Sequence, residues 1–335
     1  MDNTANNTPE AAPLYAGQGC LSGSTVKIIA VAAMFIDHAA AVVIARYLID
    51  GIQTAIASGT AGAWEREHLA VYSVYHLMRD IGRLGFPIFC FLLVEGFQRT
   101  RNVRKYALRL FMFALISELP FNLAICGQIF NSSHQNVYFT LLLGLLALCS
   151  FRFLESPGNM QKLPAPLRMV FLVTGVLLPA VFLRITDMTA AMGQEKRFIA
   201  CVLAVGVVLT ALFSCGIRHG LRQAETLGAH LTALALCMTA ADLMCTDYAG
   251  MGVLTVWVMY LFRRYKTLAM AAGCAVLSLM TLTELPAFFA LIAIALYNGR
   301  RGLKMKYIFY VFYPVHLLLL YVVAVLTGLG NVALL

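Results

Sequence analysis

The residues best suited to chemistry are an aspartate and a histidine that lie side by side in an apolar stretch. Asp37 and His38 occur within AMFIDHAA, eleven residues after Lys27, which is about 16 Å along a helix and predicts a position near the middle of a bilayer. A carboxylate beside an imidazole can orient the ring, so the pair predicts a general base. An equally favoured alternative is that the polar pair only holds neighbouring helices together. Asp37 could face another helix, because adjacent residues on a helix point about 100° apart.

A second polar segment, RDIGRLGFPIFCFLLVEGFQRTRNVRK, carries Arg79, Arg83 and Glu95. Pro87 predicts a kink that frees backbone carbonyls to line a cavity. We expect Arg79 to snorkel to the interface, whereas the planar guanidinium of the deeper Arg83 suits a phosphate or carboxylate. A basic cluster follows and indicates either an anionic-lipid contact or a landing site for cofactor phosphates. It consists of Arg99, Arg101, Arg104 and Lys105.

Other polar groups gather at the ends of later apolar runs, and we expect them on the outer side. They are Glu118, Asn122, His134, Asn136, Thr140, Asp242 and Asp247. His316 lies nine residues into the last apolar run, at a depth that matches His38. One buried histidine is usually a satisfied core residue, but two at matching depth favour a shared cavity.

Several chemistries lack their signatures. The chain contains no P-loop, no GxSxG and no dinucleotide fingerprint. Its nine cysteines form no CxxC and no Cys/His pair at zinc spacing, so we expect no metal site and no disulfide framework.

The elements that position these residues are membrane helices. Of 335 residues, 61% are hydrophobic and only 12% charged, with a mean hydropathy of +0.79. A soluble domain carries about a quarter charged residues, so the composition predicts an all-α, polytopic bundle of about 10–11 transmembrane helices. The net charge of +9 sits in short clusters between apolar runs, which is typical of topology signals and not of a nucleic-acid surface.

Runs of about 20 apolar residues indicate eleven spans. We place them at 26–49, 80–98, 106–125, 137–154, 168–184, 198–216, 227–244, 250–262, 268–283, 285–298 and 307–328. Glu284 and Pro286 predict a kinked or re-entrant segment between the ninth and tenth spans. Residues 1–24 are predicted to be a polar, mobile tail, and residues 25–335 a single transmembrane domain.

The orientation follows from the lysines and arginines between the spans. The connections on the N-terminal side hold 17 of them and those on the other side hold six. The positive-inside rule therefore predicts a cytoplasmic N-terminus, in a multi-pass protein of the inner (cytoplasmic) membrane.

Several longer stretches, spread in order from residue 27 to about 320, resemble the TraX family. They are KIIAVAAMFIDHAA, GRLGFPIFCFLLVEGFQRTRNVRKYALRLFMFALISELPFN, NVYFTLLLGLLAL, DYAGMGVLTVWVMY and KYIFYVFYPVHLLLLY. TraX proteins are conjugal-transfer membrane proteins linked to N-terminal acetylation of pilin. They are similar in outline to a broader group of multi-helix membrane acyltransferases that use an intramembrane histidine and acetyl-CoA.

The resemblance implies an acetyltransferase with His38 as the catalytic residue and Asp37 as its helper. It implies acetyl-CoA as donor, and it makes Arg83 and Glu95, together with the basic cluster, candidates for binding it. Cavity roles are implied for Asn136, Asp247 and His316. The acceptor would be an amine or hydroxyl at the extracytoplasmic face, such as a pilin N-terminus or an envelope component. The expected partners are this acceptor and membrane lipid, without nucleic acid.

Alternatives remain open at this stage. His38 could act as a base, with sequential kinetics, or as a nucleophile that forms an acetyl-imidazole, with ping-pong kinetics. Intramembrane Asp, Glu and His also mark proton relays, so a proton-coupled transporter is the main alternative, although no internal repeat supports it. A non-catalytic scaffold for pilus or envelope assembly is the third.

Overall fold

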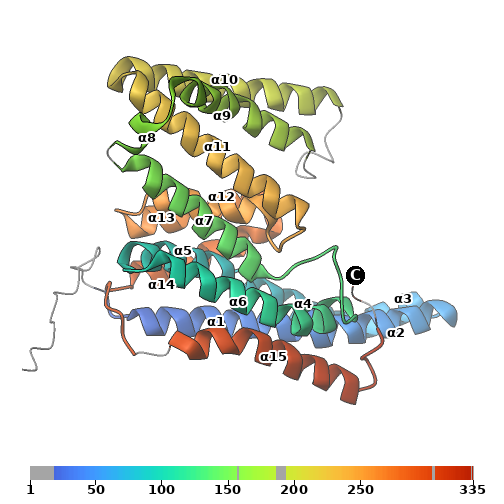
Figure 1. Ribbon diagram of the computed structural model, residues 1–335. Helices are drawn as coiled ribbons and strands as arrows, with labels where there is room; N and C mark the ends of the chain where they lie inside the picture. Colours follow the sequence, from blue (N-terminus) through green and yellow to red (C-terminus); the bar gives the residue numbers. More distant parts are fainter. Residues whose placement is uncertain (1–18, 157, 186–193, 304–305, 333, 335) are drawn as a thin grey trace, which may run out of the picture.

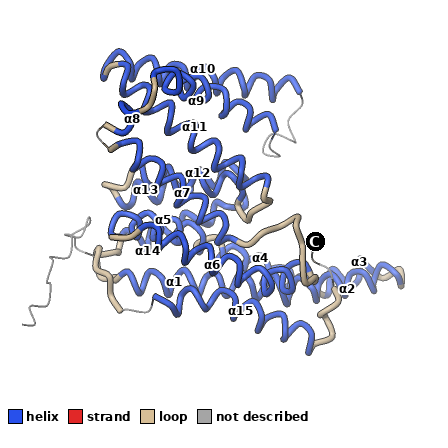
Figure 2. The backbone as a smooth tube through the Cα atoms, viewed as in Figure 1, coloured by secondary structure: helices blue, strands red, loops and turns tan. Residues whose placement is uncertain are grey.

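The computed structural model describes residues 19–156, 158–185, 194–303, 306–332 and 334. These residues form helices whose axes lie roughly along one line, and successive long helices mostly point in opposite directions (Figure 1). Helices are also the only regular structure that Figure 2 shows in the described part of the chain. The predicted all-α fold is therefore confirmed.

The first layer begins with a helical hairpin and closes with the last helix of the chain (Figure 1). Its outgoing arm is α1 (Gly23–Ala39), the π-helix η1 (Ala40–Ile44) and α2 (Ala45–Ala57). Its return passes through α3 (Ala61–Glu67), α4 (Leu69–Gly82) and α5 (Gly85–Arg99). The layer also contains α6 (Val103–Phe121), the π-helix η2 (Asn122–Cys126) and α15 (Lys306–Leu326).

Two further layers stack on the first. The middle layer contains α7 (Val137–Glu155), α12 (Ala249–Leu261) and α13 (Lys266–Met280). The 3-10 helix η4 (Leu282–Phe289) and α14 (Ala290–Ala295) lead from it back to the first layer. The outer layer is α9 (Ala165–Ile185), α10 (Gln194–His219) and α11 (Leu221–Leu243), reached through the short α8 (Asn159–Lys162).

The bundle has two ends with different connections. At the left of Figure 1 lie residues 99–103, 155–165, 219–221, 261–266 and 295–303, which we call the basic face. At the opposite end, the far face, lie residues 57–61, 126–137 and 243–249. Asparagine side chains cap a helix at each end: Asn102 accepts from Lys105 N at 2.9 Å, and Asn136 from Tyr138 N at 3.1 Å.

Seven helical stretches of the described residues are long and apolar enough to cross a membrane. They are Gly23–Ala57, Val103–Cys126, Val137–Glu155, Ala165–Phe182, Phe198–His219, Leu221–Leu243 and Tyr307–Leu326. Each overlaps a predicted span, and the chain is a multi-pass membrane protein. The other four predicted spans correspond to shorter or broken helices, so the prediction of eleven uniform spans was too simple.

Two of these breaks have clear causes. The predicted span 80–98 is divided at Arg83–Leu84 into α4 and α5, and Pro87 lies in the first turn of α5, where a missing N–H is tolerated. The predicted break near Glu284 and Pro286 is present as the 3-10 helix η4, which ends the regular helix after Met280.

The first span is longer than predicted. Its helical stretch of 35 residues is about 52 Å long at 1.5 Å per residue, whereas the hydrocarbon core is about 30 Å thick. The hairpin of α2 and α3 therefore extends past the other helix ends at the far face (Figure 1). Arg46 lies inside this helix and is fully buried.

The predicted tail falls largely outside the description, because residues 1–18 are not among the described ones. Its last residues are held at the basic face. Leu21 N donates to Leu296 O and Asn298 N donates to Leu21 O, both at 2.9 Å. Ser22 then caps α1 through Thr25 N.

Candidate functional site

The two histidines predicted at matching depth meet in the structure. His38 comes from the last turn of α1 and His316 from the middle of α15, 278 residues later. His38 Nδ1 lies 2.7 Å from His316 Nε2, and the ring centroids are 4.9 Å apart at 22°. His316 is 2% exposed, and its ring also stacks on Phe312. The two rings therefore contact each other, but only His38 is among the residues that line the cavity described below.

The hydrogen bonds define which ring nitrogen carries a lone pair. His316 Nδ1 lies 2.8 Å from the Phe312 carbonyl, which can only accept, so this nitrogen carries a hydrogen. Burial favours neutral rings, and in a neutral ring the other nitrogen accepts. His316 Nε2 therefore accepts from His38 Nδ1–H, and the lone pair of His38 is left on Nε2. The chain Phe312–His316–His38 orients a base as a buried carboxylate does in a catalytic triad.

Asp37 has a different partner from His38. Its carboxylate lies 2.8 Å from Arg79 Nη1 of α4. Arg79 was expected to snorkel to the interface, and its guanidinium instead pairs with this partly buried carboxylate of the neighbouring helix. The ring of His38 is thus oriented by His316, whereas we had assigned that helper role to Asp37 on sequence proximity. Neighbouring positions on a helix point in different directions, which separates the two side chains.

A second ion pair lies beside the first. Arg83, the C-cap of α4, is 2.7 Å from Glu284 of η4, whose side chain is 1% exposed. We had treated Glu284 only as part of a helix break. A carboxylate in an apolar run is itself a signal for a functional or paired group, and it would have identified this residue as part of the site.

A small cavity lies beside Asp37 and His38. Its volume is about 50 Å³, and Asp37, His38 and Asp247 are among the residues that line it. Cofactor and ligand pockets are typically about 300–1,000 Å³. The cavity is therefore large enough for a small group but not for a nucleotide.

The connection before α12 forms one wall of this cavity, and the backbone of this connection is strained. Cys245, Tyr248 and Ala249 have φ values of 51°, 61° and 43°, a region that non-glycine residues rarely occupy. Tyr248 stacks on Phe86 of α5 with centroids 3.7 Å apart at 3°. Such strain persists only where the surroundings enforce it, and it concentrates at functional sites. The wall is further fixed by Thr140, which donates to the Asp247 carbonyl.

The cavity lies beside the far-face ends of α7 and α12. Val137, the first residue of α7, and Asp247, just before α12, both line it. Gly23, where α1 begins at the basic face, is 15 residues from His38, or about 22 Å along the helix. His38 lies near the middle of the 35-residue first helical stretch and contacts His316 in the middle of α15. The mid-membrane depth of the two rings stays a prediction.

Asn136 lies near the cavity, but its hydrogen bonds hold two helices together. Besides capping α7, its amide donates to the Ala114 carbonyl at 2.9 Å and to Glu118 Oε2 at 2.5 Å. The residue is fully buried. It therefore ties α7 to α6 beside the site.

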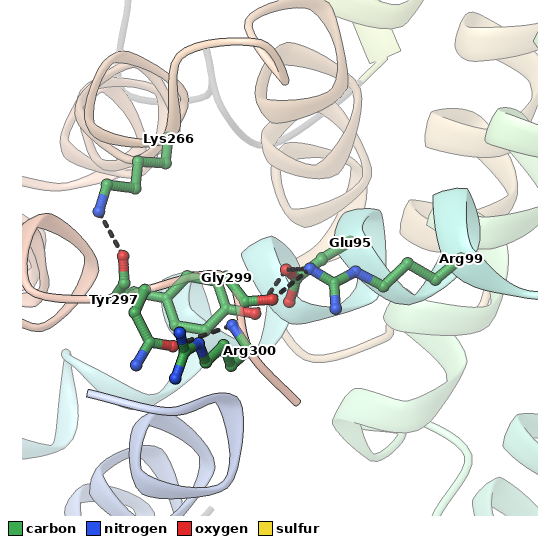
Figure 3. Close-up of polar contacts among 7 residues, drawn as sticks. Glu95, Arg99, Lys266, Tyr297, Gly299 and Arg300 are labelled. Carbon is green, nitrogen blue, oxygen red and sulfur yellow. Dashed lines mark hydrogen bonds and ion pairs between the residues drawn. The ribbon is translucent and has the colours of Figure 1, made fainter. Parts of the chain in front are cut away.

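The predicted cofactor-binding residues are separated into two groups. Arg83 follows Gly82, which lines the cavity, but Arg83 itself is not one of the lining residues. Glu95 is twelve residues further along, about 18 Å away along the helix axis. At the basic face Arg99 Nη2 donates to Glu95 Oε1 and to the Gly299 carbonyl, both at 2.7 Å (Figure 3). Tyr297 donates to the same carboxylate at 2.5 Å.

These contacts make Glu95 and Arg99 a clamp that joins α5 to the segment before α15 (Figure 3). The rest of the basic cluster, Arg101, Arg104 and Lys105, is exposed at the start of α6. Among the residues predicted to bind the cofactor, these three are the ones whose side chains are exposed.

Gly82 allows the first ion pair to form. A Cβ at this position would lie 2.3 Å from the Asp37 side chain. We expect Gly82→Ala to push α4 away from α1 and to cost about 1–3 kcal/mol, as overpacking does. Thermal unfolding in detergent would measure the loss. Gly206→Ala in α10, where a Cβ meets nothing within 4 Å, is the control and should be neutral or stabilising. Equal effects of the two substitutions would contradict this packing argument.

The matches to known proteins cover most of the chain, including the residues of the candidate site. The family model for the TraX protein matches residues 22–220 and 209–324, which include both histidines and both ion pairs of the cavity. The chain is also similar to the probable fimbrial assembly protein FimC, serogroup H1, of Dichelobacter nodosus, with 27% identity over 310 residues that cover 89% of this chain and 94% of the relative. No solved structure matches the chain. Because the family model covers nearly all of the helical bundle, the chain belongs to the TraX family.

Proposed function

We propose that this protein is an acetyltransferase of the inner membrane that moves an acetyl group from acetyl-CoA to an acceptor amine or hydroxyl at the far face. The observation that carries the proposal is the pair of hydrogen-bonded histidines at a cavity of about 50 Å³. The size suits an acetyl group, and the tautomer leaves a basic nitrogen on His38. Membership of a family linked to pilin acetylation, and a relative named for fimbrial assembly, favour a pilin-like acceptor.

In the proposed reaction the acceptor nitrogen or oxygen attacks the thioester carbonyl carbon of acetyl-CoA. A new C–N or C–O bond forms and the C–S bond breaks. His38 Nε2 takes the proton from the acceptor and passes it to the departing thiolate, so the products are the acetylated acceptor and CoA. His316 accepts from His38 Nδ1–H and stabilises the positive charge that develops on the ring.

The donor must reach the cavity from the basic face, where CoA is available. Because the cavity is small, only the acetyl end of the donor enters it, and the nucleotide stays outside. The exposed side chains of Arg101, Arg104 and Lys105 are the binding surface for its phosphates.

Removing these three charges should weaken donor binding without changing the rate of the chemical step. We expect the triple variant Arg101→Gln, Arg104→Gln, Lys105→Gln to raise the KM for acetyl-CoA about tenfold, as loss of electrostatic steering does. The kcat should stay unchanged, and 0.5 M salt should erase the difference because it screens exposed charges. Arg218→Gln with Arg222→Gln, exposed on the same face between α10 and α11, is the matched control. An unchanged KM in the triple variant would rule out this landing site.

The decisive experiment is turnover of radiolabelled acetyl-CoA by purified protein in detergent. We expect CoA release, or acid-labile label on the protein, in the wild type and its loss in His38→Ala and His38→Gln. Label retained on His38 would indicate the acetyl-imidazole route, and CoA release only with an acceptor present would indicate direct transfer. A folded wild type that neither binds nor turns over acetyl-CoA would contradict the proposal. Solute uptake into proteoliposomes would then test the proton-coupled transporter.

A further inference from the structure

A buried arginine lies eight residues beyond His38 on the same continuous helix. Arg46 is 0% exposed, and the acceptors of its guanidinium are backbone carbonyls. Nη1 donates to Val42 O at 2.8 Å and Nε to Val332 O at 3.1 Å, with a longer contact of 3.5 Å from Nη2 to Leu123 O. Burying a cation is costly unless its donors are satisfied. Arg46 meets this requirement by linking three separate segments of the chain.

Two of the three carbonyls belong to π-helices. Val42 lies in η1, which begins two residues after His38, and Leu123 lies in η2 at the end of α6. A π-helical turn replaces the regular bonding pattern of the α-helix, and such turns are frequent at functional sites. The guanidinium, with five N–H donors in a fixed fork, can satisfy carbonyls of both turns at once. It therefore fixes the conformation of the turn that follows the proposed catalytic histidine.

The third carbonyl connects Arg46 to the other histidine. After α15 ends at Leu326, the chain turns at Gly328, whose φ is +81°. Val332 then presents its carbonyl to Arg46 Nε. α15 also packs against η1 and η2. The helix that carries His38 is thus bonded to α15 by the imidazole pair and, through Arg46, to the segment that follows α15.

We propose that Arg46 is a positioning residue that sets the contact between His38 Nδ1 and His316 Nε2. It does so by holding η1 and the end of α15 at a fixed separation. This inference rests on the proposed function for its kinetic consequence, but its geometric content is independent of any acetyl transfer. No charge on Arg46 needs to reach the cavity for the effect.

The test uses the full-length protein with ¹⁵N-labelled histidine in detergent. In the wild type, two of the seven histidines should show the tautomers of the relay, assigned with His38→Gln and His316→Gln. In Arg46→Gln we expect both signals to move. Transfer should fall on the order of a hundredfold in kcat, which is the cost of about 1 Å of misplacement. The KM for acetyl-CoA should be unchanged, and the pH of half-maximal rate should shift.

Two further variants keep the test decisive. Arg66→Gln, in the exposed α3, is the matched control and should leave spectra and kinetics unchanged. Deletion of residues 331–335 removes the Val332 carbonyl while Arg46 remains, and it should move the same two signals if Arg46→Gln does not fold. Unchanged histidine signals in a folded variant would overturn the inference. If the wild type transfers no acetyl group, the proposed function fails, and the spectra alone decide the role of Arg46.

Discussion

Replacing His316 with alanine should lower the rate of acetyl transfer by roughly 10²- to 10⁴-fold, the range that a positioned acid–base group contributes. The reason is the tautomer of His38. Without His316 Nε2 to accept at 2.7 Å, nothing in the relay holds the hydrogen on His38 Nδ1, and the lone pair is no longer held on Nε2 at the cavity. Because His316 is not proposed to bind the donor, the KM for acetyl-CoA should stay unchanged.

His316→Gln separates orientation from bulk. Its amide oxygen can accept from His38 Nδ1–H, so this variant should retain more activity than His316→Ala. The control is His76→Ala, on the exposed side of α4, which should be neutral. Initial rates with radiolabelled acetyl-CoA, at several pH values, provide the measurement. A fully active His316→Ala would show that another group orients the base.

The identity of that orienting group was beyond the sequence, although both histidines were visible in it. Asp37 is adjacent to His38 in the chain, so proximity favoured it as the helper. The actual neighbour is 278 residues away, and only the packing of α15 against α1 and η1 brings it close. Matching depth in the first and last helices predicted that the two rings share a cavity. Which nitrogen of each ring bonds depends on the rotation of both helices, and hydropathy contains no information on that.

The fold was predictable wherever hydropathy dominates. Long apolar runs predicted the seven stretches that can cross a membrane, and Glu284 with Pro286 predicted the break at η4. The extension of the first helix to Ala57 was not predictable from apolar runs, because its last part contains Asp50, Gln53 and Thr54. Packing of α3 against α2 and of α4 against η1 keeps it helical instead.

Removing the carboxylate of Glu284 should produce the largest loss of stability at the site. Glu284→Ala leaves the guanidinium of Arg83, which is 21% exposed, without the carboxylate that now lies at 2.7 Å. An uncompensated buried charge costs about 3–5 kcal/mol. Replacing both partners, as in Arg83→Met with Glu284→Leu, removes the uncompensated charge. The double variant should therefore recover most of that loss, because well-packed apolar residues often substitute for a buried pair.

Activity should not follow stability in this series. η4 and α4 hold Asp37, Arg79 and the cavity in place, so the stable double variant should still transfer acetyl groups slowly. Glu225→Ala is the matched control, because it removes a 5% exposed carboxylate that pairs with Arg168 at 3.1 Å. That ion pair joins α9 to α11 in the outer layer. It should cost comparable stability but leave the rate per folded molecule unchanged.

Thermal unfolding in detergent and radiolabel turnover on the same samples would separate the two effects. A double variant no more stable than Glu284→Ala would mean that Arg83 is not the source of the loss. A double variant with full activity would mean that the pair only holds helices together. If stability returns and activity does not, the Arg83–Glu284 pair is required to shape the site. The pair would then serve to maintain the geometry around His38 and not to stabilise the protein.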